Sequence, residues 1–350
     1  MTGYALFRLP YANTATCIRQ TEGEPTELMS CQELNGRRGF VVAPFEVKAG
    51  QPILVIHPDE TTVIDLRDGT DALTDEIPTP PLDGLSAGGD RTTYAIDFAN
   101  YHSQLGLGAF QKIVLARCAD ETAAAVSPVA LFLRACQRYP RMFISLVWTA
   151  KSGCWLTATP EILLEGEGCH WRTIALAGTM RLEGEGLAGE GESATWSTKN
   201  IQEQRIVTTY ITECLEQFTS DFHEEGPCTV RAADLVHLRS DFTFTLPDNH
   251  HIGDLLQVLH PTPAVCGLPK REAFRFITHN EHTPRRYYSG FMGPLDQEET
   301  HLYVSLRCMN IEGGRCHLYA GGGLLRDSTE EQEWQETEAK LETMRRILDQ

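Results

Sequence analysis

Short apolar runs bounded by glycine and proline recur along the chain, which is the pattern of β-strands. Residues 1–67 hold several of them, for example GFVVAP at 39–44 and PILVIH at 52–57. Later runs lie at residues 110–118, 142–148, 154–158, 162–164, 175–179, 286–290, 302–309 and 317–320. So many strands favour a mixed α/β fold with large antiparallel sheets over a regular series of strand–helix–strand units.

Apolar residues recur at helical spacing in other regions. These regions are residues 93–107, 129–138, 197–218 and 255–271, the last with a proline-rich turn before a second helix begins. Near the C-terminus a further helix is expected to start at an N-capping Ser328, with Glu331 three residues later. Its apolar stripe is Trp334, Thr337, Leu341, Met344 and Leu348.

Two segments, residues 68–92 and 181–197, are rich in glycine together with proline or acidic residues, and we expect them to be loops. The 350 residues are 41% hydrophobic and 22% charged, an ordinary globular composition. The net charge of −18 argues against nucleic acid or an acidic membrane as a partner. No apolar run approaches the roughly 18 residues that a membrane span needs.

The 11 cysteines are scattered, and the N-terminal residues lack the pattern of a secretory signal. We therefore expect a reduced, cytoplasmic protein. Only six of the 30 basic residues are lysines. A buried lysine can lose its proton and an arginine cannot, so these lysines are candidates for chemistry, although compositional drift explains the bias equally well.

The glycine run 321–323 is expected to form a turn before the C-terminal helix, where a ligand can approach bare N–H groups. On that helix Glu333, Glu336 and Lys340 share a narrow face beside the apolar stripe. Two carboxylates there could hold a hard cation such as Mg²⁺, and the lysine could hold an anion. The alternative is that Glu336 and Lys340 are an ordinary surface pair, four residues apart.

Two other charged residues lie in apolar surroundings. Lys112 shares a strand face with apolar residues such as Val114, and Glu161 follows a proline between two apolar strands. Functional roles for both compete with simpler interpretations. The alternatives are an edge-strand lysine that discourages aggregation and a carboxylate in a turn.

Nine stretches form a recognisable set when they are taken together: FQKIVLARC, TATPEILLE, ALAGT, STKNIQEQRIV, VHLRSD, LHPTPAVCGLPKREA, RRYYSGFMG, YVSLRCM and AGGGLLRDSTEEQEWQETEAKLETM. In this order they resemble the chorismate-utilising enzymes, the family of isochorismate, salicylate, anthranilate and aminodeoxychorismate synthases. The resemblance covers residues 100–345, with residues 1–100 as a variable region of strands. It implies a single domain over residues 1–350, in which two large, mainly antiparallel sheets pack together with helices outside and the site in a cleft.

The resemblance also implies Mg²⁺, with chorismate as the substrate. By motif position, Glu203 and Glu336 resemble the metal carboxylates, and Glu333 lies close by. The groups that would hold or line the substrate are Tyr288, Arg307, Lys340, the backbone of Gly321 and Gly323, Thr179 and His237. Chorismate is a dianion, so Mg²⁺ with Arg307 and Lys340 would make one pocket attractive to anions in a strongly acidic chain.

Within the family, the residue at Lys112 separates the branches. The ammonia-using anthranilate and aminodeoxychorismate synthases usually have glutamine there, whereas the water-using isochorismate and salicylate synthases have lysine. Ala177 stands where the aminodeoxychorismate branch has lysine, which argues further against that branch. The turn LHPTPAVCG resembles the isochorismate branch. The chain departs from the pattern at Gln204, where many members have histidine, and in its shorter N-terminal region. The first departure leaves the orientation of Glu203 open.

We therefore expect an isochorismate synthase, an isomerase that adds water at C2 of chorismate while the C4 hydroxyl leaves. Its product would feed menaquinone or siderophore synthesis. Lys112, neutral, would be the base, and Glu161, protonated, would be the acid. The alternatives are a salicylate synthase and a chorismate-binding protein without turnover. We expect a monomer with no obligate protein partner.

Overall fold

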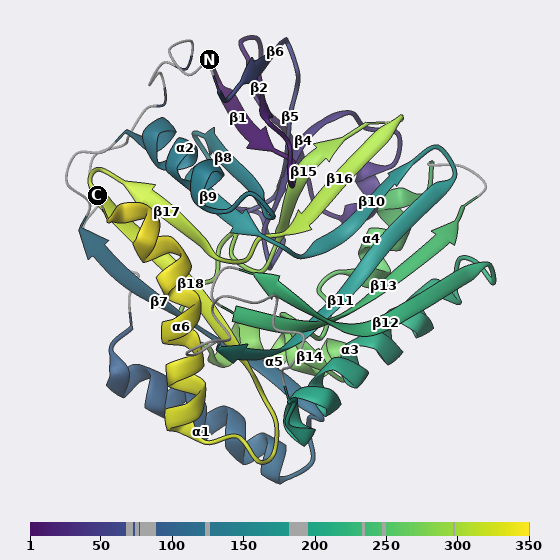
Figure 1. Ribbon diagram of the computed structural model, residues 1–350, viewed down its shortest axis with the longest axis vertical. Helices are drawn as coiled ribbons and strands as arrows, with labels where there is room; N and C mark the ends of the chain where they lie inside the picture. Colours follow the sequence, from purple (N-terminus) through teal and green to yellow (C-terminus); the bar gives the residue numbers. More distant parts are fainter. Residues whose placement is uncertain are drawn as a thin grey trace.

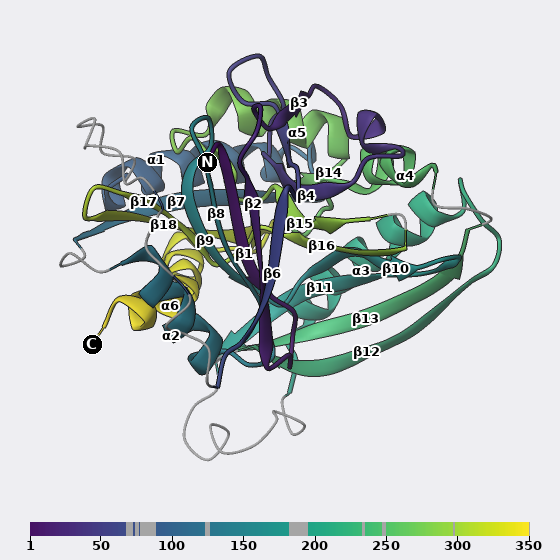
Figure 2. The same cartoon turned by 90° about the horizontal axis from the view of Figure 1, so that it is seen from above.

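The computed structural model of the protein describes residues 1–67, 73, 77, 89–122, 127–181, 195–232, 235–246, 250–296 and 298–349. Two nine-stranded sheets pack against each other, and helices lie on the outside (Figures 1 and 2). This arrangement confirms the predicted mixed α/β fold with large antiparallel sheets. The loops predicted at 68–92 and 181–197 fall mostly outside the described residues.

Each described strand pairs antiparallel with its neighbours, and the N-terminal strands extend both sheets. The first sheet has the order β14 (Gly267–Leu268), β7 (Lys112–Thr122), β18 (Arg315–Leu324), β17 (Cys308–Glu312), β9 (Gly153–Thr159), β8 (Phe143–Thr149), β1 (Gly3–Arg8), β2 (Thr14–Gln20) and β6 (Glu60–Asp65). The second has the order β12 (Phe222–Ala232), β13 (Leu235–Thr245), β11 (His170–Arg181), β10 (Ile162–Glu167), β16 (Glu299–Val304), β15 (Phe291–Leu295), β4 (Gly39–Ala43), β5 (Ile53–Ile56) and β3 (Thr26–Leu28).

The inner faces of the two sheets share one apolar core, since alternate residues of each strand point towards the opposite sheet. Phe7, Phe143 and Trp155 of the first sheet meet Phe40 and Tyr303 of the second there. The rings of Phe143 and Tyr303 stack with centroids 4.3 Å apart and planes 2° from parallel. Aromatic packing therefore fixes the spacing between the sheets next to the strands that carry the site.

The helices bury one face each against the outer sides of the sheets (Figure 1). The second sheet is covered by α3 (Thr198–Leu215) and α4 (Ile252–Leu259), near the short 3₁₀ helix Cys31–Leu34. The first sheet is covered by α2 (Pro128–Arg138) and α6 (Glu330–Leu348), and by α1 (Arg91–Gly106) and α5 (Lys270–Asn280) over β7. The helices predicted from spacing are confirmed, including the interrupted pair at 255–271, which is α4 and α5 with β14 between them.

Two local predictions around the start of the C-terminal helix are wrong. The glycine run 321–323 lies inside strand β18 and not in a turn, and none of its three residues has a positive φ. Helix α6 is capped at Thr329. The predicted cap, Ser328, instead accepts a hydrogen bond from the N–H of Leu325 at 3.0 Å, which closes the turn before the helix.

Two predicted strands also need correction. Residues 286–290 form a turn, with Arg286 and Ser289 at φ of 53° and 62°, and strand β15 begins only at Phe291. The stretch 302–309 is two strands, β16 and β17, which belong to different sheets. Apolar side chains continue across the break because both sheets are buried there, so the sequence pattern shows no interruption.

The chain passes directly from one sheet to the other at two neighbouring segments. Pro160 and Glu161 join β9 to β10, and residues 305–307 join β16 to β17. The N–H of Val304 donates to the carbonyl of Glu161 at 2.9 Å, and the N–H of Ala158 donates to the carbonyl of Arg307 at 3.1 Å. The two crossovers therefore lie side by side at the point where the sheets separate, and both carry predicted site residues.

Candidate active site

A small cavity of about 60 Å³ opens between the sheets at the two crossovers. Most of the predicted site residues line it: Glu161, Thr179, Glu203, His237, Tyr288, Arg307, Gly321, Gly323 and Lys340. Of the remaining three, Lys112 pairs with Glu203 and Glu336 pairs with Lys340, whereas Glu333 pairs with Lys199 behind the wall. The structure thus brings together residues that are up to 228 positions apart, from Lys112 to Lys340.

Lys112 begins strand β7 and is fully buried, which excludes an edge lysine in water. Its ammonium lies 2.8 Å from Oε1 of Glu203, an ion pair whose angles fall outside hydrogen-bond geometry. Burial alone would raise the pKa of the Glu203 carboxyl, but Lys112, Lys340 and Lys199 lower it below its ordinary value. Glu203 is therefore a carboxylate, and its other oxygen accepts the N–H of Gly178 at 3.2 Å.

The glycine run makes room for these charged groups. A Cβ on Gly323 would lie 2.2 Å from Oε1 of Glu203 and 2.7 Å from Cε of Lys112. A Cβ on Gly321 would lie 2.7 Å from the hydroxyl of Tyr288. Glycine is needed here for close approach of side chains to a regular strand, and not for turn formation.

Glu161 supplies an acid within the cavity. Its side chain is buried, and burial raises its pKa to about 7, against the lowering effect of Lys112, Lys340 and Arg307. A carboxyl group with this pKa holds its proton in a large fraction of molecules at neutral pH. It can therefore donate a proton to a leaving group, which an ordinary surface glutamate cannot do at that pH.

Arg307 and His237 form a buried pair that also lines the cavity. Arg307 has φ of 46°, in the left-handed region, and its guanidinium Nη2 contacts Nε2 of His237. A guanidinium can only donate, so Nε2 accepts and Nδ1–H faces the carbonyl of Gly178 at 3.2 Å. Burial, then Arg307 and Lys340, hold the pKa of His237 well below its ordinary value. The histidine is neutral, and it orients a cation towards the cavity.

Lys340 and Tyr288 complete the polar wall. The ammonium of Lys340 donates to the carbonyl of Gly321 at 2.9 Å and pairs with Glu336 Oε1 at 2.8 Å. The predicted surface pair of Glu336 and Lys340 thus exists, but each side chain is only 19% exposed and it borders the cavity. The ring of Tyr288 stacks on Tyr319 at 5.6 Å, which holds its hydroxyl near Gly321.

Glu203, Glu333 and Glu336 carry negative charge that a divalent cation would balance, but in the described part of the chain their oxygens are not gathered into a three-ligand group. Glu333 is fully buried, and its Oε2 has no hydrogen-bond partner among the described residues. Burial and then Glu336 raise its pKa, although Lys199 pairs with its other oxygen. The ammonium of Lys199 interacts with all three carboxylates, so it occupies the region where a metal cation would balance them. An orphaned carboxylate oxygen among excess negative charge is what a hard ion such as Mg²⁺ satisfies.

Gln204, where the family resemblance led us to expect histidine, joins two elements at the edge of the cavity. Its Oε1 accepts the N–H of Ala177 at 2.9 Å, and its Nε2 donates to the carbonyl of Ala175 at 3.1 Å. The two bonds tie helix α3 to strand β11 beside the bulge at Gly178. Gln204 therefore fixes the helix that carries Glu203, one position away.

Sequence reasoning missed two members of the site. Lys199 lies four residues before Glu203 on the same helix face. It is one of only six lysines, and that scarcity is the signal that could have identified it. Gly322 has a neighbour that only the structure reveals, because its Cβ would lie 3.0 Å from Oε2 of Glu333. No local pattern distinguishes that glycine from the two beside it.

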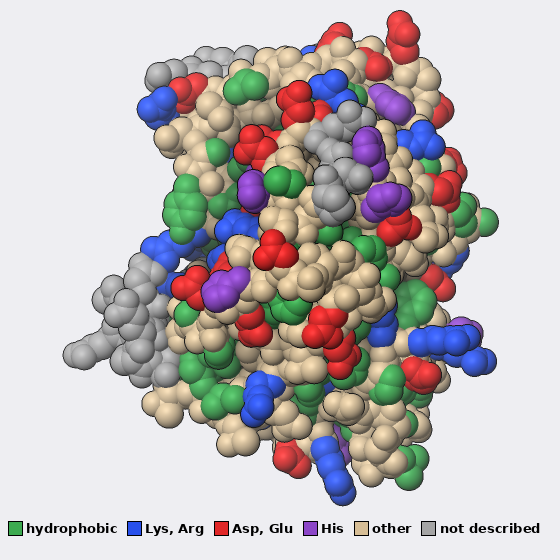
Figure 3. Space-filling view, turned by 90° about the vertical axis from the view of Figure 1, so that its right-hand side faces the viewer, with side chains coloured by type: hydrophobic (Ala, Val, Ile, Leu, Met, Phe, Trp, Pro, Cys, Tyr) green, Lys and Arg blue, Asp and Glu red, His purple; other side chains and the backbone are tan. Residues whose placement is uncertain are grey.

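A larger groove of about 580 Å³ lies at one end of the second sheet, lined by residues such as Glu165, His170 and His301. None of the predicted site residues lines it. Figure 3 shows one side of the molecule, on which carboxylates and histidines stand among neutral side chains. The cavity at the crossovers is the better candidate, since it collects buried charged groups with shifted pKa values.

Comparison with known proteins identifies the class that this fold and cavity define. The sequence pattern of the family described as "Chorismate binding enzyme" matches residues 87–349. The chain therefore belongs to the chorismate binding enzyme family.

Several curated relatives are similar in sequence. The chain is 32% identical over 277 residues to the salicylate biosynthesis isochorismate synthase of Pseudomonas aeruginosa. It is 31% identical over 242 residues to isochorismate synthase EntC and 34% identical over 246 residues to isochorismate synthase MenF, both of Escherichia coli. These matches cover 77%, 68% and 69% of this chain but only 58%, 62% and 56% of the relatives, so the chain spans little more than half of their length.

Solved structures share the fold at lower identity. A putative 2,3-dihydroxybenzoate-specific isochorismate synthase, DhbC, from Bacillus anthracis superposes with a TM-score of 0.81 at 21% identity, over 99% of this chain and 96% of that one. MenF, the menaquinone-specific isochorismate synthase of Escherichia coli, gives 0.80 at 23% identity, over 99% and 89%. Component I of anthranilate synthase from Streptococcus pneumoniae gives 0.67 at 15%, over 98% and 92%. Among the described residues, no helix is long and apolar enough to cross a membrane.

Proposed function

We propose that the protein is an isochorismate synthase, which interconverts chorismate and isochorismate. The observation that carries the proposal is a buried lysine and a buried glutamate with a pKa of about 7, at a cavity whose wall holds cationic side chains. The named isochorismate synthases among the relatives support the same reaction.

Lys112 and Glu161 would divide the proton transfers. Lys112, which pairs with Glu203 as an ammonium in this structure, would first have to lose that proton; as the neutral amine it would then take a proton from the water that attacks C2 of the ring. Glu161 donates its proton to the C4 oxygen as that hydroxyl leaves, and the double bonds shift between them. In the reverse direction the two residues exchange roles. Protonation of Glu161 at neutral pH supports this assignment, because an ionised carboxylate could not protonate the leaving group.

Arg307, Tyr288 and Lys340 would bind the two carboxylates of the substrate. Arg307 is held in place by His237, and Lys340 by Glu336 and Gly321, so each donor is oriented before the substrate arrives. We also propose Mg²⁺ at Glu203, Glu333 and Glu336, where it would neutralise a substrate carboxylate and these three side chains. The N–H and C=O groups of Gly321 and Gly323, with Thr179, form the rest of the wall.

Product analysis tests the proposed reaction. The purified chain with Mg²⁺ should convert chorismate into a mixture with isochorismate, and the same mixture should be reached from isochorismate, because the two are near-isoenergetic isomers. Rising salicylate fluorescence with stoichiometric pyruvate would favour a salicylate synthase instead. Saturable chorismate binding without any product would indicate a binding protein without turnover.

Substitution of Lys112 tests the acid–base assignment. Lys112→Gln should retain chorismate binding but lose about 10²–10⁴-fold in kcat, because the loss falls on the transition state. Lys112→Arg should fail as well, since a guanidinium does not give up its proton. The matched control is Lys151→Gln, a lysine that is 38% exposed and pairs with Glu27 on the surface. A near-normal kcat for Lys112→Gln would assign Lys112 a structural role.

We further propose that residues 1–350 act as one domain, that the protein is a cytoplasmic monomer, and that the isochorismate feeds menaquinone or siderophore synthesis. The contributions of β1, β2 and β6 to one sheet and of β3, β4 and β5 to the other support a single unit. Sedimentation analysis of the purified chain would test the monomer, and a single cooperative unfolding transition would test the single domain.

A further inference from the structure

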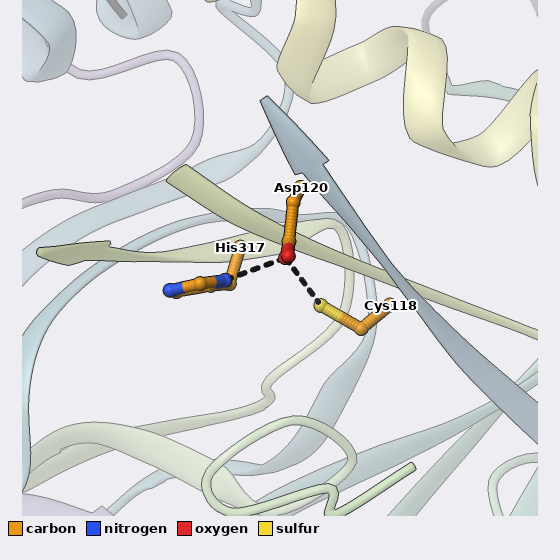
Figure 4. A group of neighbouring side chains, drawn as sticks. All are labelled: Cys118, Asp120 and His317. Carbon is orange, nitrogen blue, oxygen red and sulfur yellow. Dashed lines mark hydrogen bonds and ion pairs between the residues drawn. The ribbon is translucent and has the colours of Figure 1, made fainter. Parts of the chain in front are cut away.

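Three side chains that have no part in the proposed reaction face one another at the far end of strands β7 and β18 (Figure 4). Cys118 and Asp120 are two residues apart on β7, so both point to the same side of the sheet. His317 lies on β18, directly opposite Asp120 in the register. These residues are separate from the carboxylates predicted to bind Mg²⁺.

The ligand atoms are close enough to share an ion. Nδ1 of His317 lies 2.6 Å from Oδ1 of Asp120, Sγ of Cys118 lies 4.0 Å from the same oxygen, and all three atoms fall within 4.8 Å of one another. Bonds of about 2.0–2.3 Å to a tetrahedral zinc place ligand atoms roughly 3.3–3.7 Å apart. Side-chain movements of about 1 Å therefore convert the present cluster into a coordination shell.

The other nitrogen of His317 gives an independent indication. Its Nε2 lies 3.8 Å from Oε2 of Glu312, an ion-pair distance that is too long for a hydrogen bond as the side chains stand, and Arg286 holds that carboxylate through Nη1 at 3.1 Å. Arg286 is itself fixed by Oδ1 of Asn310 at 3.0 Å. A histidine that binds a metal through one nitrogen commonly has a carboxylate behind the other, which orients the ring and makes it a stronger ligand.

The donor set selects the kind of ion. A thiolate, an imidazole and one carboxylate suit Zn²⁺ and its analogues Co²⁺ and Cd²⁺, whereas Mg²⁺ prefers oxygen ligands alone. We propose that Cys118, Asp120 and His317 bind a zinc-class divalent ion, with water as the fourth ligand. The side chain of Asp120 is 26% exposed, which leaves a route for that water and for the ion.

Without the ion, Cys118 is a thiol. Burial, followed by the charge of Asp120, raises its pKa well above the ordinary range. Metal binding therefore releases a proton and replaces it with the ion. The ion would link β7 to β18 beside Tyr319, which pairs with Cys118 in the register and lines the cavity. The site does not depend on the proposed reaction.

Cobalt titration tests the site, because a thiolate bound to Co²⁺ gives a charge-transfer absorption that oxygen ligands do not give. The full chain is treated with EDTA, and the exposed Cys169 and Cys228 are replaced by serine to remove competing thiols. One Co²⁺ per chain should bind with this absorption, and Zn²⁺ should displace it. Cys118→Ser should abolish the band, and Asp120→Asn and His317→Gln should each weaken Co²⁺ binding at least tenfold.

The control variants separate this site from the cavity and from its own surroundings. Glu336→Gln, in the cavity, should leave the thiolate band unchanged. Glu312→Gln should weaken Co²⁺ binding about 10–100-fold, the effect of losing the carboxylate behind a ligating histidine. A band that persists in Cys118→Ser, or no band in the parent chain, overturns the proposal. If Cys118→Ser does not fold, Asp120→Asn decides the question, because unchanged Co²⁺ affinity in that surface variant also overturns it.

Discussion

Glu161 shows how a single side chain acquires a chemical role from its position. The local sequence showed a charged residue after a proline between apolar strands, and the family resemblance led us to expect a protonated acid there. The structure places it in a crossover between two sheets, where burial raises its pKa to about 7. The proton that it carries is therefore available near neutral pH.

The pH dependence of turnover follows from this shift. Because the acid must be protonated, kcat/KM should fall about tenfold per pH unit once the pH exceeds about 7, and Glu161→Gln should remove both the activity and this limb. The folded state also holds the proton more tightly than an unfolded carboxyl does. The stability that Glu161 contributes is thus full below its ordinary pKa and is lost as the pH rises through 7.

One pair of experiments tests both the predicted pH dependence of the rate and the predicted pH dependence of stability. Steady-state rates across the pH range, together with urea unfolding at pH 5 and pH 8, should show the pH-dependent loss of stability shrinking in Glu161→Gln. A flat rate profile between pH 6 and 9 would mean that another group supplies the proton.

Gly323 is a second residue whose role comes from its position, because the absence of a side chain leaves room for Glu203 and Lys112. Gly323→Ala should lower kcat/KM by about 10²-fold or more, because its Cβ at 2.2 Å from Glu203 Oε1 must displace that carboxylate or Lys112. Overpacking should also cost about 1–3 kcal/mol of stability. Gly106→Ala is the control, since nothing lies within 4 Å of its Cβ position. Equal activities of the two variants would refute the steric argument.

At the scale of elements, helix α3 and strand β11 are joined by the side chain of Gln204. Gln204→Ala would leave the N–H of Ala177 and the carbonyl of Ala175 buried without partners, at about 1–3 kcal/mol for each group. The urea midpoint should fall accordingly, and Mg²⁺ affinity should weaken because the neighbouring Glu203 loses its fixed position. Gln202→Ala, exposed on the same helix, should change stability by no more than about 0.5 kcal/mol.

The sequence predicted most elements because their signals are local. The apolar period of α2 and the two short runs that became β8 and β9 report which face of each segment is buried. The break at residues 305–307 was not predictable in this way, since it depends on which distant strands pair with β16 and β17. The same holds for the glycines of β18, whose need for space comes from Lys112 and Glu203 in other elements.

For the site, likewise, residue identities were predictable from the sequence, but their packing was not. Lys112, Arg307 and Lys340 were named from motif positions, and the structure brings them to one cavity. The complete burial of Glu333 and the central place of Lys199 follow from how α3 and α6 pack beside β18, which no spacing within either helix reveals.

At the scale of the whole molecule, the cluster of carboxylates should link metal binding to stability. Mg²⁺ at a hundred times its Kd should stabilise the fold by about 2.7 kcal/mol, because it binds only the folded chain. EDTA should abolish turnover, and Mg²⁺ should restore it. Thermal unfolding followed with and without Mg²⁺ measures the shift in Tm.

Glu333→Gln distinguishes the effect of the buried charge on stability from the effect of metal binding on stability. Without metal this variant should unfold at a higher Tm than the parent, because a buried charge in excess is removed. Its Tm should no longer respond to Mg²⁺. Glu331→Gln, at an exposed position on the same helix, should keep the full response. A parent protein whose Tm is unaffected by Mg²⁺ would contradict the assignment of the metal carboxylates.

The side-by-side crossovers at Glu161 and Arg307 have a consequence for how such a protein can evolve. Where the chain crosses from one sheet to the other, the two sheets must diverge. The cavity between them therefore arises from the topology and not from particular side chains. The hydrogen bonds that hold the crossovers run through backbone atoms of Val304, Ala158 and their partners. Substitutions at the rim can therefore alter the chemistry while the void persists. Descendants of one ancestor can thus acquire different reactions without first inventing a new pocket.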